Sequence, residues 1–308
     1  MARLDLGDPS VSSPPDAPAP VEGGASARPR WRPRPGVSAR GIGAVLALII
    51  MIAVVAPIAV VAISSFWSGA FLRAAGEVTL QNYVNFLTHP DTGALMLSTA
   101  WITVSASAIA MTTGAVLAWI VARADIPFRS VAWFLPVTPL LLSGLLRDTA
   151  WVGLYSPETG IVNRFLMQLF GLSSPPFDIF SYGGVIITMG LTLAPLPYLI
   201  LLAPLSAMNP SLEEASRASG SGHLRTLWTV TLPLMRPALL SGFTVSAIIV
   251  ATSFETPVII GLPGGVHTFM ATIYSTMSNS LNFSQASAQS MVYLALIAVL
   301  LLWYRHST

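Results

Sequence analysis

The chain has 308 residues, of which 54% are hydrophobic and only 9% are charged. Charged residues make up about a quarter of an ordinary soluble domain, so this composition excludes a soluble globular protein. The chain contains no cysteine, which excludes disulfides, thiolate catalysis and cysteine-ligated metal centres.

The basic residues also exclude an ATP site of the P-loop type. All fifteen are arginine, and a P-loop needs a lysine to reach the phosphates. If the protein uses ATP, another chain must bind it, and no enzymatic centre is expected in this one. The four histidines are scattered, at His89, His223, His267 and His306, so neither a metal site nor a cofactor is predicted. Nothing in the sequence points to nucleic acid as a partner.

Residues 1–40 are rich in Pro, Ala, Ser and Gly and hold six of the fifteen arginines. Such a composition predicts a disordered cytoplasmic tail. A signal peptide is the alternative, but the apolar run that follows is longer than a signal sequence needs.

Six apolar stretches follow the tail, and about 20 apolar residues are needed for a helix to cross a bilayer. We therefore predict an all-α integral membrane protein whose domain, residues 41–304, has six transmembrane helices. The expected spans are 41–64, with a kink at Pro57, and 95–121, 131–146, 183–207, 237–260 and 288–304.

The arginines predict the orientation of these spans. With six crossings, twelve arginines fall on the side of the N-terminal tail and three, Arg73, Arg147 and Arg164, fall on the other. Positive residues accumulate on the cytoplasmic side, so both termini are expected in the cytoplasm. The third span is short and ends at Arg147-Asp148, expected to be an ion pair at the outer mouth. The outer segment 65–94 is expected to hold a short amphipathic piece on the membrane surface. The segment 155–182 is expected to hold a turn, a short helix and a Pro-Pro loop, and Gly160 and Asn163 fit that turn and the helix after it.

Between the fourth and fifth spans lies the segment "LEEASRASGSGHLRTLWTVTLP", residues 212–233. Ser211 and Glu214 have the spacing of a capping box, which predicts a helix start. Gly220 fits the position that ends a helix. The pattern predicts a cytoplasmic helix of about eight residues whose small side chains let another surface approach closely, and Pro237 is expected to open the next span.

The spacing resembles the EAA signature of binding-protein-dependent ABC importer permeases. Glu214-Ala215-Ser216, then Gly220, then Val230 and Leu232-Pro233 keep every interval, with Ser and Val as the two departures. The resemblance implies a fold like that of type I importers and a coupling helix in the loop 209–236, which docks on a cytoplasmic ATPase. The ATPase-coupling positions it implies are Glu213, Glu214, Ala215, Ser216, Ala218, Gly220, Val230, Leu232 and Pro233.

The same resemblance implies the other partners. They are an ABC ATPase dimer, a second permease half (homodimer, heterodimer or fused half), an extracytoplasmic solute-binding protein and the lipid bilayer of a bacterial inner membrane. Many iron-type permeases look like two such halves in one chain, so this sequence is expected to be a stand-alone subunit, a natural half or a truncated product.

Glu255 lies inside the fifth predicted span, in "SFETPVIIGLPGG". Carboxylates within a membrane usually face the bundle interior or an aqueous path, so Ser253 and Glu255 are candidates for the translocation path. The alternative is a carboxylate buried against a Ser or Arg of another helix. "GLPGG" is expected to be a re-entrant or outer turn.

The segment around Glu255 resembles the ferric-iron branch of the family, so the first expected substrate is ferric iron, with polyamine, thiamine or phosphonate as alternatives. An ion-coupled secondary transporter remains an alternative class, although no internal repeat is visible. A structural or assembly membrane protein is a further one.

Overall fold

The structure is a computed structural model, and it describes residues 39–68, 76–124 and 129–307. The predicted tail, residues 1–40, therefore lies almost wholly outside the described residues. The chain divides into two compact units, Met1–Ala53 and Val54–Thr308, and the packing described below is that of the second. The described residues are almost entirely helical, with one isolated β-bridge between Trp67 and Val78.

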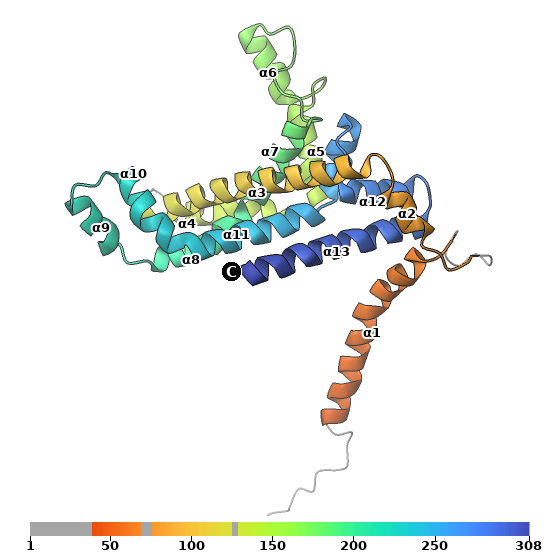
Figure 1. Cartoon of the computed structure of the whole chain (residues 1–308). Helices are drawn as coiled ribbons and strands as arrows, with labels where there is room; N and C mark the ends of the chain where they lie inside the picture. The colour runs from red at the N-terminus through yellow and green to blue at the C-terminus, as the bar shows by residue number, and fades with distance from the viewer. Residues whose placement is uncertain (1–38, 69–75, 125–128, 308) are drawn as a thin grey trace, which may run out of the picture. The chain divides into compact units, whose positions relative to one another are not determined.

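The helices follow one another in an order close to the predicted one (Figure 1). The first half comprises α1 (Ala39–Ser65), α2 (Gln81–Leu87), α3 (Thr92–Arg123), α4 (Arg129–Phe134), the 3₁₀ segment η1 (Leu135–Leu141), α5 (Gly144–Tyr155) and α6 (Ile161–Phe170). The second half comprises α7 (Tyr182–Leu193), α8 (Pro195–Ala207), α9 (Ser211–Ala218), α10 (His223–Thr226), the π-helical turn η2 (Leu227–Thr231), α11 (Leu232–Thr252), the π-helical turn η3 (Pro257–Gly261), η4 (Leu262–Gly264), α12 (Phe269–Ser278) and α13 (Phe283–Ser307).

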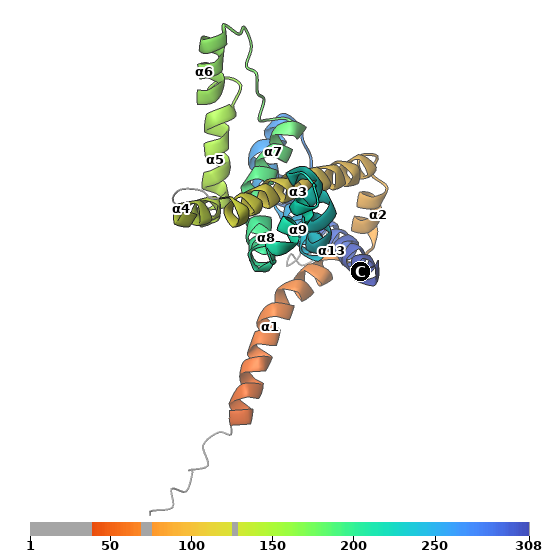
Figure 2. The same ribbon diagram turned by 90° about the vertical axis from the view of Figure 1, so that its left-hand side faces the viewer.

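Helix α3 is the central helix of the bundle and packs along α7, α8 and α11 (Figures 1 and 2). The contact with α8 is close because Gly114 has no side chain: a Cβ there would lie 2.7 Å from the amide nitrogen of Tyr198. Gly190 of α7 is similar, since its Cβ would lie 2.7 Å from the Cβ of Ile109. Small residues allow helix backbones to approach in this way in membrane proteins.

Two of the predicted spans are broken helices rather than straight ones. The third consists of Ser130–Leu141 and Gly144–Tyr155, which meet at 101°. Pro136 and Pro139 lie in this region, where η1 takes 3₁₀ geometry, and Pro cannot donate to an α-helical ladder. The fourth bends by 41° between α7 and α8, at Pro195.

The fifth predicted span, 237–260, was wrong at both ends. The helix is continuous from His223 to Thr252, and it then breaks before Glu255. Pro237 lies inside α11 and does not open it. The segment Pro257–Gly264 then turns by 88° into α12, which agrees with the turn predicted at "GLPGG".

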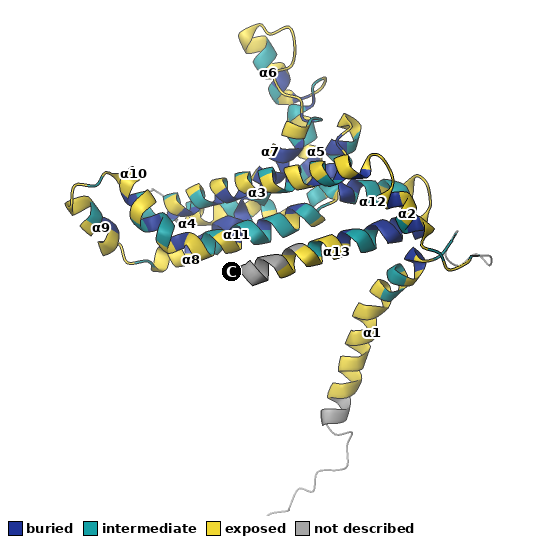
Figure 3. Cartoon of the chain, viewed as in Figure 1, coloured by how far each residue is buried: buried dark blue, intermediate teal, exposed yellow. Residues whose placement is uncertain are grey.

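Within the described residues, three helices are long and apolar enough to cross a membrane, and up to six segments are if each bent pair counts as one span. Large apolar side chains are exposed along many helices (Figure 3), including Leu97, Leu141 and Leu302, which are 65–72% exposed. Such surfaces are unusual on soluble monomers and are those expected of a chain embedded in lipid. The two short helices predicted in the longer loops are present as α2 and α6.

Candidate functional site

Helix α9 has the predicted length of eight residues, but it does not begin with the predicted capping box. Pro210 already has helical dihedral angles and takes the N-cap position, so Ser211 is the first residue of the helix. The side chain of Asn209 instead accepts the amide N–H of Ser211 at 3.1 Å, and the carbonyl of Pro210 accepts the amide of Glu214 at 3.0 Å. The amide donors at this helix end are thus satisfied by the residues before it.

Gly220 ends α9 as predicted. Its φ of +85° is in the left-handed region, where a residue without a Cβ is favoured. The amide of Gly220 donates to the carbonyl of Arg217 at 2.9 Å, and that of Ser221 donates to the carbonyl of Ser216 at 3.2 Å. These two bonds form a Schellman motif, so the end of the helix is fixed by its backbone.

The two faces of α9 differ. Glu213 faces inward and is only 5% exposed. The other face carries exposed side chains, namely Leu212, Glu214, Ala215 and Ala218. Helix α9 lies at one end of the bundle (Figure 1). Its exposed residues include an apolar residue, two small residues, one carboxylate and the guanidinium of Arg217. Ser216 lies between the faces and bonds to Thr226 of α10 at 3.1 Å.

The buried carboxylate of Glu213 is bonded to two other elements. Its Oε1 accepts from Nε of Arg123 at 3.3 Å and from the hydroxyl of Thr231 at 3.0 Å. Arg123 is the last residue of α3, and its Nη2 also donates to the carbonyl of Met208 at 3.2 Å. Sequence reasoning placed Glu213 among the coupling residues but missed these partners, because Arg123 lies 90 positions earlier in the chain.

The stretch after α9 that holds the last three implied coupling positions includes a π-helical turn within a longer helix. Val230 lies in the π-helical turn η2, and Leu232 and Pro233 begin α11 without a break. Pro233 has no amide hydrogen to donate inside this continuous helix, and it directly follows the π-helical turn, where the hydrogen-bond register changes. The EAA segment is thus continued directly by one of the helices that pack on α3.

Glu255 lies at the meeting point of two broken helices. It follows the end of α11, after the break at Ser253 and Phe254, and its carboxylate occupies the place that a Cβ on Gly144 would take. Gly144 is the first residue of α5. The hydroxyl of Ser253 donates to Ile249 of its own helix at 2.7 Å, so it does not hold Glu255.

A second carboxylate, that of Asp148, lies beside Glu255 and was expected at an outer mouth. It is instead fully buried, and its Oδ2 accepts from the hydroxyl of Thr256 at 2.8 Å. The expected ion pair with Arg147 is long, with Nε 3.9 Å from Oδ1, and neither of those two atoms has a hydrogen-bond partner in the described residues. Asp148 therefore joins α5 to the segment after α11.

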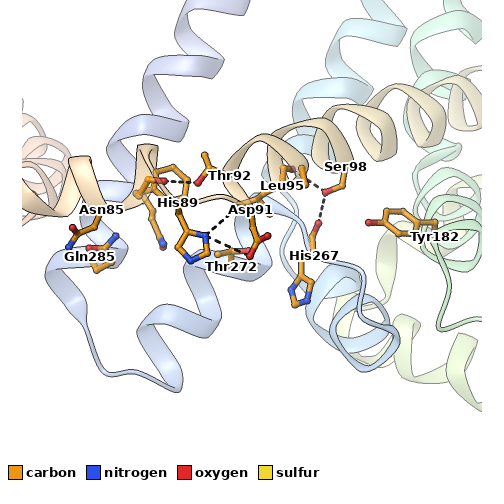
Figure 4. Close-up of a pocket in the computed structure, with 13 residues that line it drawn as sticks. Asn85, His89, Asp91, Thr92, Leu95, Ser98, Tyr182, His267, Thr272 and Gln285 are labelled. Carbon is orange, nitrogen blue, oxygen red and sulfur yellow. Dashed lines mark hydrogen bonds and ion pairs between the residues drawn. The ribbon is translucent and has the colours of Figure 1, made fainter.

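A cavity of about 430 Å³, with several polar side chains in its walls (Figure 4), lies at the end of α3 opposite α9 (Figure 1). His89 and Asp91, from the turn before α3, approach each other at 3.7 Å, and Ser98 donates to the carbonyl of His267 at 2.6 Å. Among the described residues, no three His, Asp or Glu side chains gather closely enough to hold a metal ion. The sequence pattern did not single out this cavity, because its walls come from segments far apart in the chain.

Two relatives and one solved structure are informative. A ferric transport permease, FbpB 1 of Haemophilus influenzae, is 31% identical over 54% of this chain, and the match spans only 26% of that protein. A 2-aminoethylphosphonate transport permease, PhnU of Salmonella typhimurium, is 26% identical over 81% of this chain and 89% of its own length. The crystal structure of a bacterial alginate ABC transporter, in complex with a periplasmic protein, contains a chain with the same fold (TM-score 0.70, 16% identity, 86% of this chain and 92% of that one).

The family assignment rests on a match to a family model. The sequence model of the binding-protein-dependent transport system inner membrane component covers residues 110–307, more than half of the chain. That range includes α9, η2 and the broken helices around Glu255. The chain belongs to this family of ABC importer permeases, which are membrane transport subunits and not enzymes.

Proposed function

We propose that this protein crosses the bacterial inner membrane six times, with both termini in the cytoplasm, and that α9 is its coupling helix. The observation that carries the proposal is the construction of α9. Its inner face is fastened by Glu213, and its outer face offers Leu212, Glu214, Ala215 and Ala218 to a partner. A short rigid helix of this kind can pass a rigid-body movement from one subunit to another.

The partner on α9 is an ABC ATPase dimer, which binds the ATP and Mg²⁺ of the cycle. A second permease half completes the path, and an extracytoplasmic binding protein delivers the solute. The family description and the periplasmic protein bound to the similar alginate transporter support that last partner. Exposed apolar side chains of α1, such as Ile58 and Ile63, are suited to contact lipid or the second half.

The translocation path runs past Glu255 and Ser253. Solute sites of transporters commonly lie where helices are interrupted near the middle of the membrane, and two interrupted helices meet at Glu255. The chain has no cysteine, so single cysteines at 253 and 255 can be labelled with a membrane-impermeant thiol reagent. Both are expected to react, whereas a cysteine at the exposed apolar position Val104 is expected to stay unlabelled. Equal protection at all three would contradict the path.

For the solute we propose ferric iron, because a ferric transport permease is 31% identical over half of this chain. A phosphonate is the competing candidate, since PhnU matches over a longer region. Uptake of radioactive iron and of labelled 2-aminoethylphosphonate, compared between cells with and without the gene, separates the two. Iron uptake that does not depend on the gene would remove the first candidate.

The role of α9 is tested by co-purification with candidate ATPase subunits of the same genome. Ala218→Arg places a long charged side chain on the exposed face and is expected to abolish association. Ala94→Arg, at an exposed position of α3 at the opposite end of the bundle, is the matched control and is expected to keep it. Loss of association in both variants, or in neither, would count against docking at α9.

A further inference from the structure

Glu213 and Glu214 are adjacent in the sequence, but the structure gives them different surroundings. Glu214 is exposed, whereas Glu213 is 5% exposed and its side chain points into the protein. A docking partner on the exposed face of α9 can reach Glu214. It cannot reach Glu213 without displacing the groups that bind it. The two glutamates therefore need separate roles.

The groups around Glu213 belong to the transmembrane bundle. Oε1 accepts from Arg123 at the end of α3 and from Thr231 in η2. Arg217, one turn along α9, lies 3.9 Å from Oε2 and is half exposed. The side chain of Arg123 is 13% exposed, so its pairing with Glu213 is largely shielded from solvent and is screened less than a surface ion pair.

The guanidinium of Arg123 makes a second bond at the same time, from Nη2 to the carbonyl of Met208 at the end of α8. One planar group thus joins the ends of α3 and α8 to α9, which a lysine with a single ammonium could not do with the same geometry. The covalent connections of α9 are less restrictive, because Asn209-Pro210 precedes it and Gly220 and Gly222 follow it.

A cavity of about 250 Å³ adjoins the pair, and its walls include Trp119, Arg217 and His223. The side chains of the pair therefore have open space on one side. On the other side, α3 is in close backbone contact with α8 at Gly114, so a displacement of the end of α3 is passed along the bundle.

We infer that the Glu213–Arg123 ion pair is the positioning contact that passes movement of α9 to α3, and that Glu213 does not contact the ATPase. This inference rests on the proposed function of α9 and adds a residue role to it. The ion pair holds the coupling helix to the central helix of the bundle. Without it, α9 can still dock, but its movement is taken up by the loops on either side.

Two single-cysteine reporters test this in the complex with the ATPase. A cysteine at Ala218 reports docking through a disulfide to a cysteine in the ATPase cleft. A cysteine at Ser253 reports the path through its rate of thiol labelling with and without ATP. We expect Glu213→Gln to keep the cross-link. The ratio between the labelling rates with and without ATP should fall about tenfold, which corresponds to about 1.4 kcal/mol of coupling. Glu158→Gln, at an exposed glutamate between α5 and α6 that takes no part in α9 or its contacts, is the matched control and leaves the ATP response intact.

A double-mutant cycle separates this role from a general loss of structure. If the pair itself transmits the movement, Arg123→Gln has the same effect as Glu213→Gln, and the double variant is no worse than either. Additive effects, or an unchanged labelling response in Glu213→Gln, would overturn the inference. If Glu213→Gln does not fold, Arg123→Gln and Thr231→Val test the same contact from the other side. If the protein with the cysteine at position 218 and an unchanged Glu213–Arg123 pair forms no cross-link, that result would instead refute the proposed function.

Discussion

The close contact between α3 and α8 makes Gly114 the position where the smallest change should have a measurable effect. In Gly114→Ala, the new Cβ would lie 2.7 Å from the amide nitrogen of Tyr198 and 2.8 Å from the carbonyl oxygen of Ala194. Optimal separations between such atoms are about 3.5–4.0 Å. Both neighbours are backbone atoms, so they cannot rotate away, and the two helices must move apart.

The expected cost follows from two opposing contributions. Overfilling a packed interior lowers the free energy of unfolding by about 1–3 kcal/mol. Replacing glycine by alanine inside a helix raises it by roughly 0.5–1 kcal/mol. The net loss in the free energy of unfolding therefore lies between about 0 and 2.5 kcal/mol, with a central value of about 1 kcal/mol. For a domain of roughly 150–250 residues, that central loss corresponds to a fall in Tm of roughly 2–4 °C.

The assay is thermal unfolding of the purified protein in detergent, with Gly153→Ala as the matched control. Gly153 lies inside α5, and a Cβ there would meet no atom within 4 Å, so its replacement should leave Tm unchanged or raise it slightly. If Gly114→Ala is as stable as Gly153→Ala, then α3 and α8 do not approach as closely as described, and the route from α9 through α3 loses its support.

Two further predictions concern the cluster around Glu255. Gly144→Ala should lower Tm, because the new Cβ overlaps the Glu255 carboxylate, and adding Glu255→Ala should restore Tm by vacating that space; a double variant no better than the single one would argue against the contact. Thr256→Val removes the 2.8 Å hydrogen bond to the buried Asp148 and should cost about 1.5–3 kcal/mol in the free energy of unfolding. Thr252→Val, at an exposed hydroxyl bonded only within its own helix, is its control and should cost less; equal losses would show that Asp148 does not depend on Thr256.

Much of α9 could be predicted from the sequence, because its signals are local. The length of the helix and its end at Gly220 follow from the order of small residues and glycine over a few positions. The capping box was wrong for a local reason too, since Asn209 and Pro210 satisfy the first amides before Ser211 and Glu214 are needed.

The partners of Glu213 and Asp148 could not be predicted, because they depend on how distant helices pack. No spacing rule connects Glu213 to Arg123, which lies 90 residues away. The predicted start of the fifth span was wrong for another reason. Pro237 indicates a helix start when read in isolation, but proline is tolerated within membrane helices where neighbouring groups satisfy the freed carbonyl.

The central claim is that α9 is the coupling helix, and a disulfide cross-link at Ala218 tests it most directly. The chain has no native cysteine, so one cysteine at this exposed position reports on a single surface. Co-expressed with an ATPase subunit that carries one cysteine in its docking cleft, it should form a disulfide whose yield changes with ATP. A folded permease that forms no cross-link while the ATPase is present would contradict the account and would leave α9 as a short helix of a loop with no docking role.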